Sequence, residues 1–223
     1  MHDSSLRYGL FVLCVCASSL RAQSYPPPFP REAARMLFEN DRVAVWDVTW
    51  PKDQPTAMHL HPVDQLSVTL VGGTVRVTRL GGTPAVNESK PGTVILTPHG
   101  TVHMEEGLSD VPQRKIMLQL KSSLSSSGAG ASPREGAVKL MENARVIAWD
   151  FTWRPGQKTH HTDTLDSVIV FLDGGTIRSI SDQGVSNDIT RSAGEVAYFP
   201  RSAGAYTEEA VRGSPHAVIV ELK

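Results

Sequence analysis

The sequence predicts an all-β protein made of two similar domains, and three observations support this prediction. Short runs rich in β-branched and aliphatic residues recur along the chain, among them VTLV at 68–71, TVILT at 93–97 and KIMLQL at 115–120. Gly-Gly, Pro-Gly and Thr-Pro pairs separate such runs, and TVRVT at 74–78 alternates between polar and apolar residues. The first half of the chain also returns in the second half as an internal repeat. Many short strands at close spacing favour a sandwich or a small barrel.

Length and composition limit the classes of function. The chain has 223 residues, of which 40% are hydrophobic, which is enough for one large or two small globular cores. The formal net charge is −1. A chain so close to neutral lacks the excess of positive charge that is typical of proteins that bind nucleic acid or anionic membranes. We therefore expect no nucleic-acid partner.

Residues 1–22 have the pattern of a secretory signal peptide. Arg7 precedes the apolar run YGLFVLCVCASSL, and RAQS follows it, so that cleavage after Ala22 is expected. The run is too short to span a bilayer, although an uncleaved anchor is the alternative. Cys14 and Cys16 are the only cysteines and both lie in this run, so the mature chain has no thiol for disulfides, nucleophilic catalysis or thiolate ligation. We expect a periplasmic or secreted protein that leaves the membrane after cleavage.

The remaining chain divides into an arm, a domain, a linker and a second domain. The proline-rich segment 23–36 predicts an extended arm, and the Ser/Gly-rich segment 122–136 a linker. The intervening domains are 37–121 and 137–223, because FENDRVAVWDVTW at 38–50 returns as MENARVIAWDFTW at 141–153 and VGGTVR at 71–76 returns as DGGTIR at 173–178. Trp46 and Trp50 of the first copy return as Trp149 and Trp153 of the second. Their recurrence favours a packing role over a binding role.

Three histidines in the first domain are candidate metal ligands. His59 and His61 are two residues apart on a predicted strand, so their side chains share one face, and Gln65 has the same parity whereas Asp64 does not. An H-x-H pair alone leaves a metal site and a surface pair as equal alternatives. His103 follows a Pro-His-Gly turn at the end of a later strand. Neutral imidazole is the commonest ligand of borderline divalent metals, so the three together predict a metal site.

The spacing of these residues resembles the two motifs of the cupin superfamily. The pattern consists of His59-x-His61, three residues, Gln65, six residues and Gly72, followed by Gly92, five residues, Pro98-x-Gly100, two residues and His103. It departs from the family in Gln65, where a glutamate is usual, in Asp53 for the leading glycine and in Gly107 for the closing asparagine. The resemblance implies an all-β chain of two tandem antiparallel jelly-roll barrels, a bicupin. It also implies His59, His61 and His103 as metal ligands, with Gln65 as a fourth.

The second domain aligns with the first but loses most of these residues. His161 stands for His59, Asp163 for His61, Ser167 for Gln65 and Ala205, beside Tyr206, for His103. We expect a degenerate cupin domain there, the alternative being a weak metal site at His160, His161 and Asp163. Elsewhere, His99 is interpreted as a loop residue, and Glu105 and Glu106 as solvated turn charges.

The expected cofactor is one divalent ion (zinc, copper, manganese, iron or nickel) in the first domain. Such an ion with open coordination positions suits an enzyme acting on a small oxygen-bearing substrate, dioxygenase-like or an isomerase or lyase. Because Gln65 is neutral, the site would keep a charge of +2 instead of +1, which favours an anionic small-molecule ligand. The alternative is a non-catalytic periplasmic binding or scaffold protein with a structural or sensing metal. Assembly as a homodimer is left open.

Overall fold

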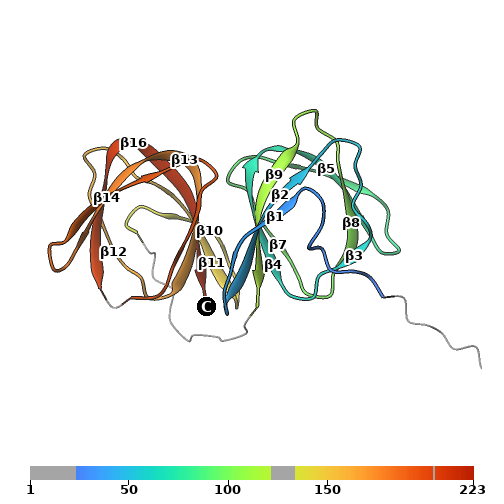
Figure 1. The fold of residues 1–223 in the computed structure, drawn as a ribbon, viewed down its shortest axis with the longest axis horizontal. Helices are drawn as coiled ribbons and strands as arrows, with labels where there is room; N and C mark the ends of the chain where they lie inside the picture. The colour runs from blue at the N-terminus through green and yellow to red at the C-terminus, as the bar shows by residue number, and fades with distance from the viewer. Residues whose placement is uncertain (1–23, 122–133, 203) are drawn as a thin grey trace, which may run out of the picture.

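The computed structural model describes residues 24–121, 134–202 and 204–223, which form sixteen strands in two barrels (Figure 1). The predicted signal peptide and most of the predicted linker lie outside these residues. Within the described part of the chain there is no helix, so none is long and apolar enough to cross a membrane. The all-β prediction is confirmed.

The first barrel is a sandwich of two antiparallel sheets. One sheet has the strand order β1-β2-β9-β4-β7 and the other the order β3-β8-β5-β6. The strands are β1 (Ala34–Glu39), β2 (Val43–Trp50), β3 (His59–Leu60), β4 (Gln65–Val71), β5 (Gly73–Arg79), β6 (Ala85–Ser89), β7 (Val94–Thr97), β8 (Val102–Gly107) and β9 (Gln113–Leu120).

The second barrel repeats this topology with fewer, longer strands. Its strands are β10 (Val138–Glu142), β11 (Val146–Thr152), β12 (Thr159–Thr162), β13 (Asp166–Ser181), β14 (Ser186–Arg191), β15 (Val196–Phe199) and β16 (Ala205–Leu222). Strand β13 continues through the region that separates β4 from β5, and β16 through the region that separates β8 from β9. The order β10-β11-β16-β13, with β15 on β13 and β12 on β16, therefore matches the two sheets of the first barrel.

Each barrel has an interior core that contains the repeated tryptophans. Trp46 and Trp50 are buried with Val48, Val75 and Met117 in the first barrel. Trp149 and Trp153 are buried in a cluster with Phe151, Phe171 and Ile219 in the second. Their burial agrees with the predicted packing role, and burying large aromatic rings is a major source of core stability.

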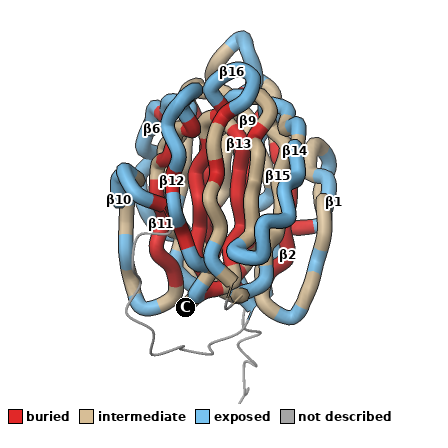
Figure 2. The backbone as a smooth tube through the Cα atoms, turned by 90° about the vertical axis from the view of Figure 1, so that its left-hand side faces the viewer, coloured by how far each residue is buried: buried red, intermediate tan, exposed pale blue. Residues whose placement is uncertain are grey.

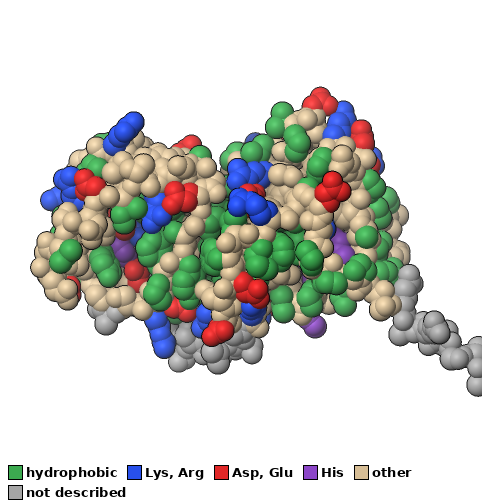
Figure 3. Space-filling view, in the orientation of Figure 1, with side chains coloured by type: hydrophobic (Ala, Val, Ile, Leu, Met, Phe, Trp, Pro, Cys, Tyr) green, Lys and Arg blue, Asp and Glu red, His purple; other side chains and the backbone are tan. Residues whose placement is uncertain are grey.

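A third apolar core joins the two barrels. The cluster contains residues from both barrels that are fully or almost fully buried. Figure 2 shows buried residues as red stretches along the central strands, and Figure 3 shows hydrophobic side chains where the two barrels meet. The first barrel contributes Val43, Val45, Leu66, Val68, Ile116, Leu118 and Leu120, and the second Val146, Ala148, Val168, Val170, Val218, Val220 and Leu222.

Two arginines at matching repeat positions brace this interface from opposite sides. Arg42 donates to the carbonyl of Leu222 (3.0 Å) and lies 3.7 Å from the Asp166 carboxylate. Arg145 donates to the carbonyl of Leu120 (3.0 Å) and forms an ion pair with Asp64 (3.3 Å). Each barrel thus makes the equivalent contact to the other, as the two subunits of a two-fold symmetric dimer do, although here both barrels belong to one chain.

The segment before β1 packs on the first barrel. Phe29 stacks on Trp46 with ring centroids 4.8 Å apart, and the Arg31 guanidinium lies 5.3 Å from the centroid of Trp50. Arg134 has the corresponding place in the second barrel, 5.2 Å from the centroid of Trp153. The sequence Pro-Arg-Glu recurs at 30–32 and 133–135, so the repeat extends upstream of the first strand of each domain. The domain boundaries stay predictions.

Candidate metal centre

The structure brings His59, His61 and His103 together inside the first barrel. One ring nitrogen from each lies within 4.8 Å of the other two, and all three side chains are buried. The Nε2 atoms of His61 and His103 are 2.9 Å apart. No other group of three histidine, cysteine or carboxylate ligands converges in this way among the described residues.

Backbone pairing of two short segments sets this convergence. His59 on β3 lies directly opposite His103 on β8 in the antiparallel register. The pairing continues beyond the strand, because the amide of His61 donates to the carbonyl of Thr101 (2.9 Å) and the amide of Gly100 donates to the carbonyl of His61 (2.9 Å). The extended backbone at 59–61 therefore points both histidines inward, as their spacing predicts.

Burial keeps two of the three rings, those of His61 and His103, neutral at physiological pH. Burial lowers the pKa of His61 to about 4, with the neighbouring His103 and His59 adding to the effect. Burial likewise lowers the pKa of His103 to about 4, assisted by His59 and Arg79. His59 Nδ1 is held 2.9 Å from the carbonyl of Ala57, which fixes that nitrogen as the donor and leaves Nε2 as the acceptor.

A divalent ion fits this donor set. A metal-to-imidazole distance is about 2.0–2.1 Å, and two nitrogens 2.9 Å apart at that distance subtend roughly 90°, the angle between neighbouring octahedral ligands. His61 Nδ1 is buried without a hydrogen-bond partner among the described residues, so nothing there competes for the orientation of this ring. Three neutral imidazoles in a buried site are the ligands that zinc, copper, iron and nickel accept.

Gln65 begins β4 and is almost fully buried, opposite Thr97 on one side and Gln119 on the other. Its Oε1 has no hydrogen-bond partner within the described ranges. A buried amide oxygen without a partner is unfavourable, so a ligand to this oxygen would offset its desolvation. Direct ligation of a metal by Gln65 stays a prediction.

A cavity of about 320 Å³ lies inside the barrel and reaches His103 of the histidine cluster. His103, Glu105, Arg79 and Lys115 line its polar part. Apolar and small polar side chains line the rest, including Val75, Val77, Ile95, Met117, Ser67 and Thr97. This volume is at the small end of the range of small-molecule sites, which begins near 300 Å³.

Glu105 and Lys115 are cavity residues that the sequence interpretation missed. The interpretation of Glu105 as a solvated turn charge is wrong: it shares its parity with His103 on β8, and its Oε2 accepts a hydrogen bond from Trp50 Nε1 (3.0 Å). Glu106 instead forms an ion pair with Arg76 (2.5 Å). The parity rule that was applied to His59 and His61 would have identified Glu105.

The remaining polar candidates lie elsewhere. Asp64 does not join the histidines, because its Oδ1 accepts a hydrogen bond from the amide of His99 (2.8 Å) and its Oδ2 pairs with Arg145 across the interface. His99 is exposed on a loop, as expected.

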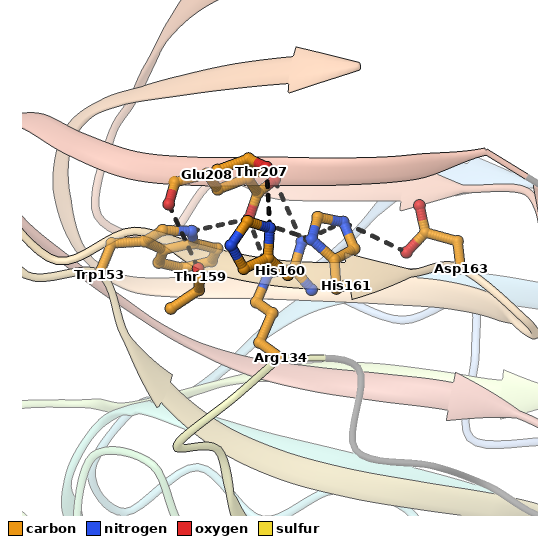
Figure 4. Close-up of polar contacts among 8 residues, drawn as sticks. All are labelled: Arg134, Trp153, Thr159, His160, His161, Asp163, Thr207 and Glu208. Atoms are coloured by element: carbon orange, nitrogen blue, oxygen red, sulfur yellow. Dashed lines mark hydrogen bonds and ion pairs between the residues drawn. The ribbon is translucent and has the colours of Figure 1, made fainter. Parts of the chain in front are cut away.

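In the second barrel an arginine occupies the place next to the remaining histidine (Figure 4). Arg134 Nε and Nη2 donate to Glu208 (2.7 and 3.3 Å), and Nη2 also donates to His161 Nε2 (3.4 Å). Glu208 accepts a further hydrogen bond from Trp153 Nε1 (2.8 Å), just as Glu105 does from Trp50. Asp163 lies 3.7 Å from His161 Nε2.

Strand pairing shifts one predicted correspondence by a residue. His161 lies opposite Tyr206, as His59 lies opposite His103, so Tyr206 and not Ala205 takes the place of the third histidine. The rings of His161 and Tyr206 stack with centroids 5.5 Å apart. Burial, with the charge of Arg134, lowers the pKa of His161 to about 4. Tyr206 and Asp163 thus stand at two of the three imidazole positions, and the Arg134 guanidinium lies beside the histidine that is left.

The sequence matches no protein-family model and no curated protein. Its fold matches many solved structures. A cupin 2 conserved barrel domain protein from Leptotrichia buccalis is 12% identical, with a TM-score of 0.53 over 85% of this chain and 88% of that one. A variant of oxalate decarboxylase OxdC from Bacillus subtilis is 14% identical (TM-score 0.59, covering 82% and 69%). A variant of salicylate 1,2-dioxygenase from Pseudoaminobacter salicylatoxidans is 10% identical (TM-score 0.57, covering 81% and 72%). With its two antiparallel barrels and their inward histidines, the chain has the cupin fold.

Proposed function

We propose that this chain is an exported bicupin whose first barrel holds one divalent metal ion and converts a small anionic organic substrate. The observation that carries the proposal is the convergence of three buried histidines, one of which, His103, also lines a cavity of about 320 Å³ together with Glu105 and Lys115. His59, His61 and His103 would hold the ion. When bound, it would polarise a substrate oxygen or activate the substrate toward oxygen chemistry.

The chain's own side chains supply binding and proton-transfer groups around this site. Arg79 and Lys115 place positive charge in the cavity lining, which also contains Glu88 and Glu105, so an anionic ligand would bind beside the two cationic side chains. Trp50 fixes the Glu105 carboxylate by its hydrogen bond, so Glu105 is the positioned group that can exchange a proton with a ligand. The named substrates of two proteins with the same fold, oxalate and salicylate, are both carboxylates, which supports this class.

The second barrel is proposed to be a degenerate cupin domain that holds no metal. Its interior contains the Arg134–Glu208 ion pair beside His161, and a bound cation next to a guanidinium would be repelled. One metal per chain is the expected stoichiometry.

Metal analysis of the mature protein, purified from the compartment in which the organism keeps it, tests the proposal most directly. We expect about one equivalent of a divalent metal and an N-terminus that begins near residue 23. Turnover of a panel of carboxylates, followed by oxygen uptake and by product analysis, then separates an oxidoreductase from an isomerase or lyase. Tight binding without turnover across the panel would favour a non-catalytic binding protein, and a metal-free native protein would overturn the proposal.

A further inference from the structure

Lys115 is a buried lysine that has no hydrogen-bond partner within the part of the chain that the structure describes. It lies on β9 with 9% of its surface exposed, and its ammonium faces the cavity of the first barrel. Among the described residues its contact is with the Trp50 ring, whose centroid lies 5.6 Å from Nζ. Burial lowers the pKa of Lys115, while the nearby Glu105 charge partly restores it. An ammonium group in such a place is costly unless an anion compensates it.

The fold does not require a lysine at this position. Lys115 lies opposite Thr69 in the pairing of β9 with β4, and the same pair in the second barrel is Ala217 opposite Phe171. Both residues of the second pair are buried in an apolar core, where the Phe171 ring occupies the interior. The second barrel thus forms with apolar residues at this pair of positions. We infer that the lysine of the first barrel has a role other than packing.

The surroundings of Lys115 have further unsatisfied polar groups. Thr69 Oγ1 and Gln113 Oε1 are buried without hydrogen-bond partners inside the described segments. Gln113 neighbours Lys115 on the same inward face of β9, two residues away. On the other side of the cavity, Val75 and Val77 of β5 offer an apolar wall. Lys115 therefore suits an anion, and Val75 and Val77 an apolar group, while Glu88 and Glu105 add negative charge to the same lining.

We propose that Lys115 anchors the carboxylate of a small monocarboxylate whose apolar portion lies against Val75 and Val77. The proposal rests on the proposed function only in using the same cavity, since Lys115 is separate from the three histidines and can bind an anion without a metal. Glu105 nearby would repel a second negative charge, so a monoanion is favoured over a dianion such as phosphate. The negative charge of the Glu105 carboxylate thus favours a small ligand that carries a single negative charge.

Calorimetric titration of the full mature chain with benzoate, benzamide and inorganic phosphate tests this assignment. Benzamide has the shape of benzoate but no charge. Each ligand is titrated into chelator-treated and metal-loaded protein, with metal content measured in parallel. We expect benzoate to bind both forms at least tenfold more tightly than benzamide or phosphate. If benzoate binds neither form, or no better than benzamide, the proposal is overturned, whereas the metal stoichiometry reports separately on the proposed function.

Two variants locate the anchor. Lys115→Met keeps the length of the side chain and should weaken benzoate at least tenfold, with metal content and benzamide binding unchanged. Lys158→Met, at an exposed lysine of the second barrel, removes the same charge and should bind as the parent does. Should Lys115→Met disturb folding, the double variant Thr69→Phe with Lys115→Ala copies the second barrel's own residues and should fold while losing the preference for benzoate. Benzoate affinity that survives in both folded variants would refute the anchor.

Discussion

Replacing Glu208 by glutamine should destabilise the protein far more than the same change at Glu105, its counterpart in the repeat. Glu208 is buried and accepts two hydrogen bonds from Arg134, at 2.7 and 3.3 Å, and one from Trp153 at 2.8 Å. Burial raises the pKa of Glu208, but the charge and hydrogen bonds of Arg134 outweigh burial and leave the pKa below its usual value. The carboxylate is therefore ionised in the folded state, and its loss leaves a guanidinium buried without its counter-charge.

The size of the effect follows from the burial of the pair. Removing one partner of a buried ion pair costs about 3–5 kcal/mol of unfolding free energy. For a chain of this length each kcal/mol lowers Tm by about 2–4 °C, so Glu208→Gln should lower Tm by about 6–20 °C. Glu105 accepts one hydrogen bond from Trp50 and forms no ion pair within the described residues, although its charge acts on the nearby Lys115. Glutamine keeps an acceptor for Trp50, so Glu105→Gln should cost less than Glu208→Gln, about 1–2 kcal/mol.

Urea unfolding and calorimetry of metal-free protein measure both variants under one condition. The double variant Arg134→Met with Glu208→Gln removes both charges and should recover most of the lost stability, because no uncompensated buried charge remains. If Glu208→Gln loses no more stability than Glu105→Gln, the second barrel is not held by a buried ion pair and the account of Figure 4 is wrong.

Three further predictions concern the histidines and Gln65. His103→Ala should abolish tight metal binding and with it the metal-induced gain in unfolding free energy, which is about 2.7 kcal/mol at a metal concentration 100 times Kd. His161→Ala should leave the metal content unchanged, and equal metal loss from both variants would contradict a single site. Gln65→Glu should hold manganese or iron more tightly against a chelator and should weaken anion binding, whereas Gln65→Ala should keep the metal. Unchanged anion affinity in Gln65→Glu would mean that the extra positive charge of the site is not used for binding anions. In metal-free protein, where burial lowers the pKa of His61, His103 and His161 to about 4, the unfolded chain takes up these protons first as pH falls below about 6.5. The unfolding free energy should therefore decrease from pH 6.5 to pH 4, and a flat urea midpoint over that range would show that these rings are not buried and neutral.

The histidine cluster could be predicted from sequence because it depends on local rules. Two residues of equal parity on one strand share a face, and the turn at Pro98–Gly100 returns the chain so that His103 lies opposite His59. Parity places only His59 and His61 together; His103 entered the prediction through the spacing that resembles the cupin motifs, because its pairing with His59 is long-range. The internal repeat similarly determined that there are two all-β units with the same strand order.

Lys115 could not be predicted from such rules, because its strand turns its polar face toward the barrel interior, whereas an ordinary amphipathic strand turns its apolar face inward. In QRKIMLQL the polar residues Gln113, Lys115 and Gln119 alternate with apolar ones, a pattern that usually places the polar face in water. Here the apolar face, with Ile116 and Leu118, is covered by the other barrel, so the polar face turns inward. Only the docking of the two barrels reveals which face is the interior. Arg134 was missed for a different reason, because it lies in a segment whose composition resembles a linker.

The inward polar face and outward apolar face of these strands also explain the role of the second barrel, which lacks the three histidines. In β4, Gln65, Ser67 and Thr69 face the interior, so Leu66 and Val68 must face outward. Without the second barrel this outward face, with Ile116 and Leu118 beside it, would be a large exposed apolar surface, which soluble proteins rarely tolerate. The first barrel keeps a smaller apolar core around Trp46 and Trp50 beside its polar interior groups, and the interface adds the burial of its outward face. The second barrel, whose interior is filled by Phe171 and closed by the Arg134–Glu208 pair, supplies the missing apolar surface and lets the first barrel keep unsatisfied polar groups for its ligand.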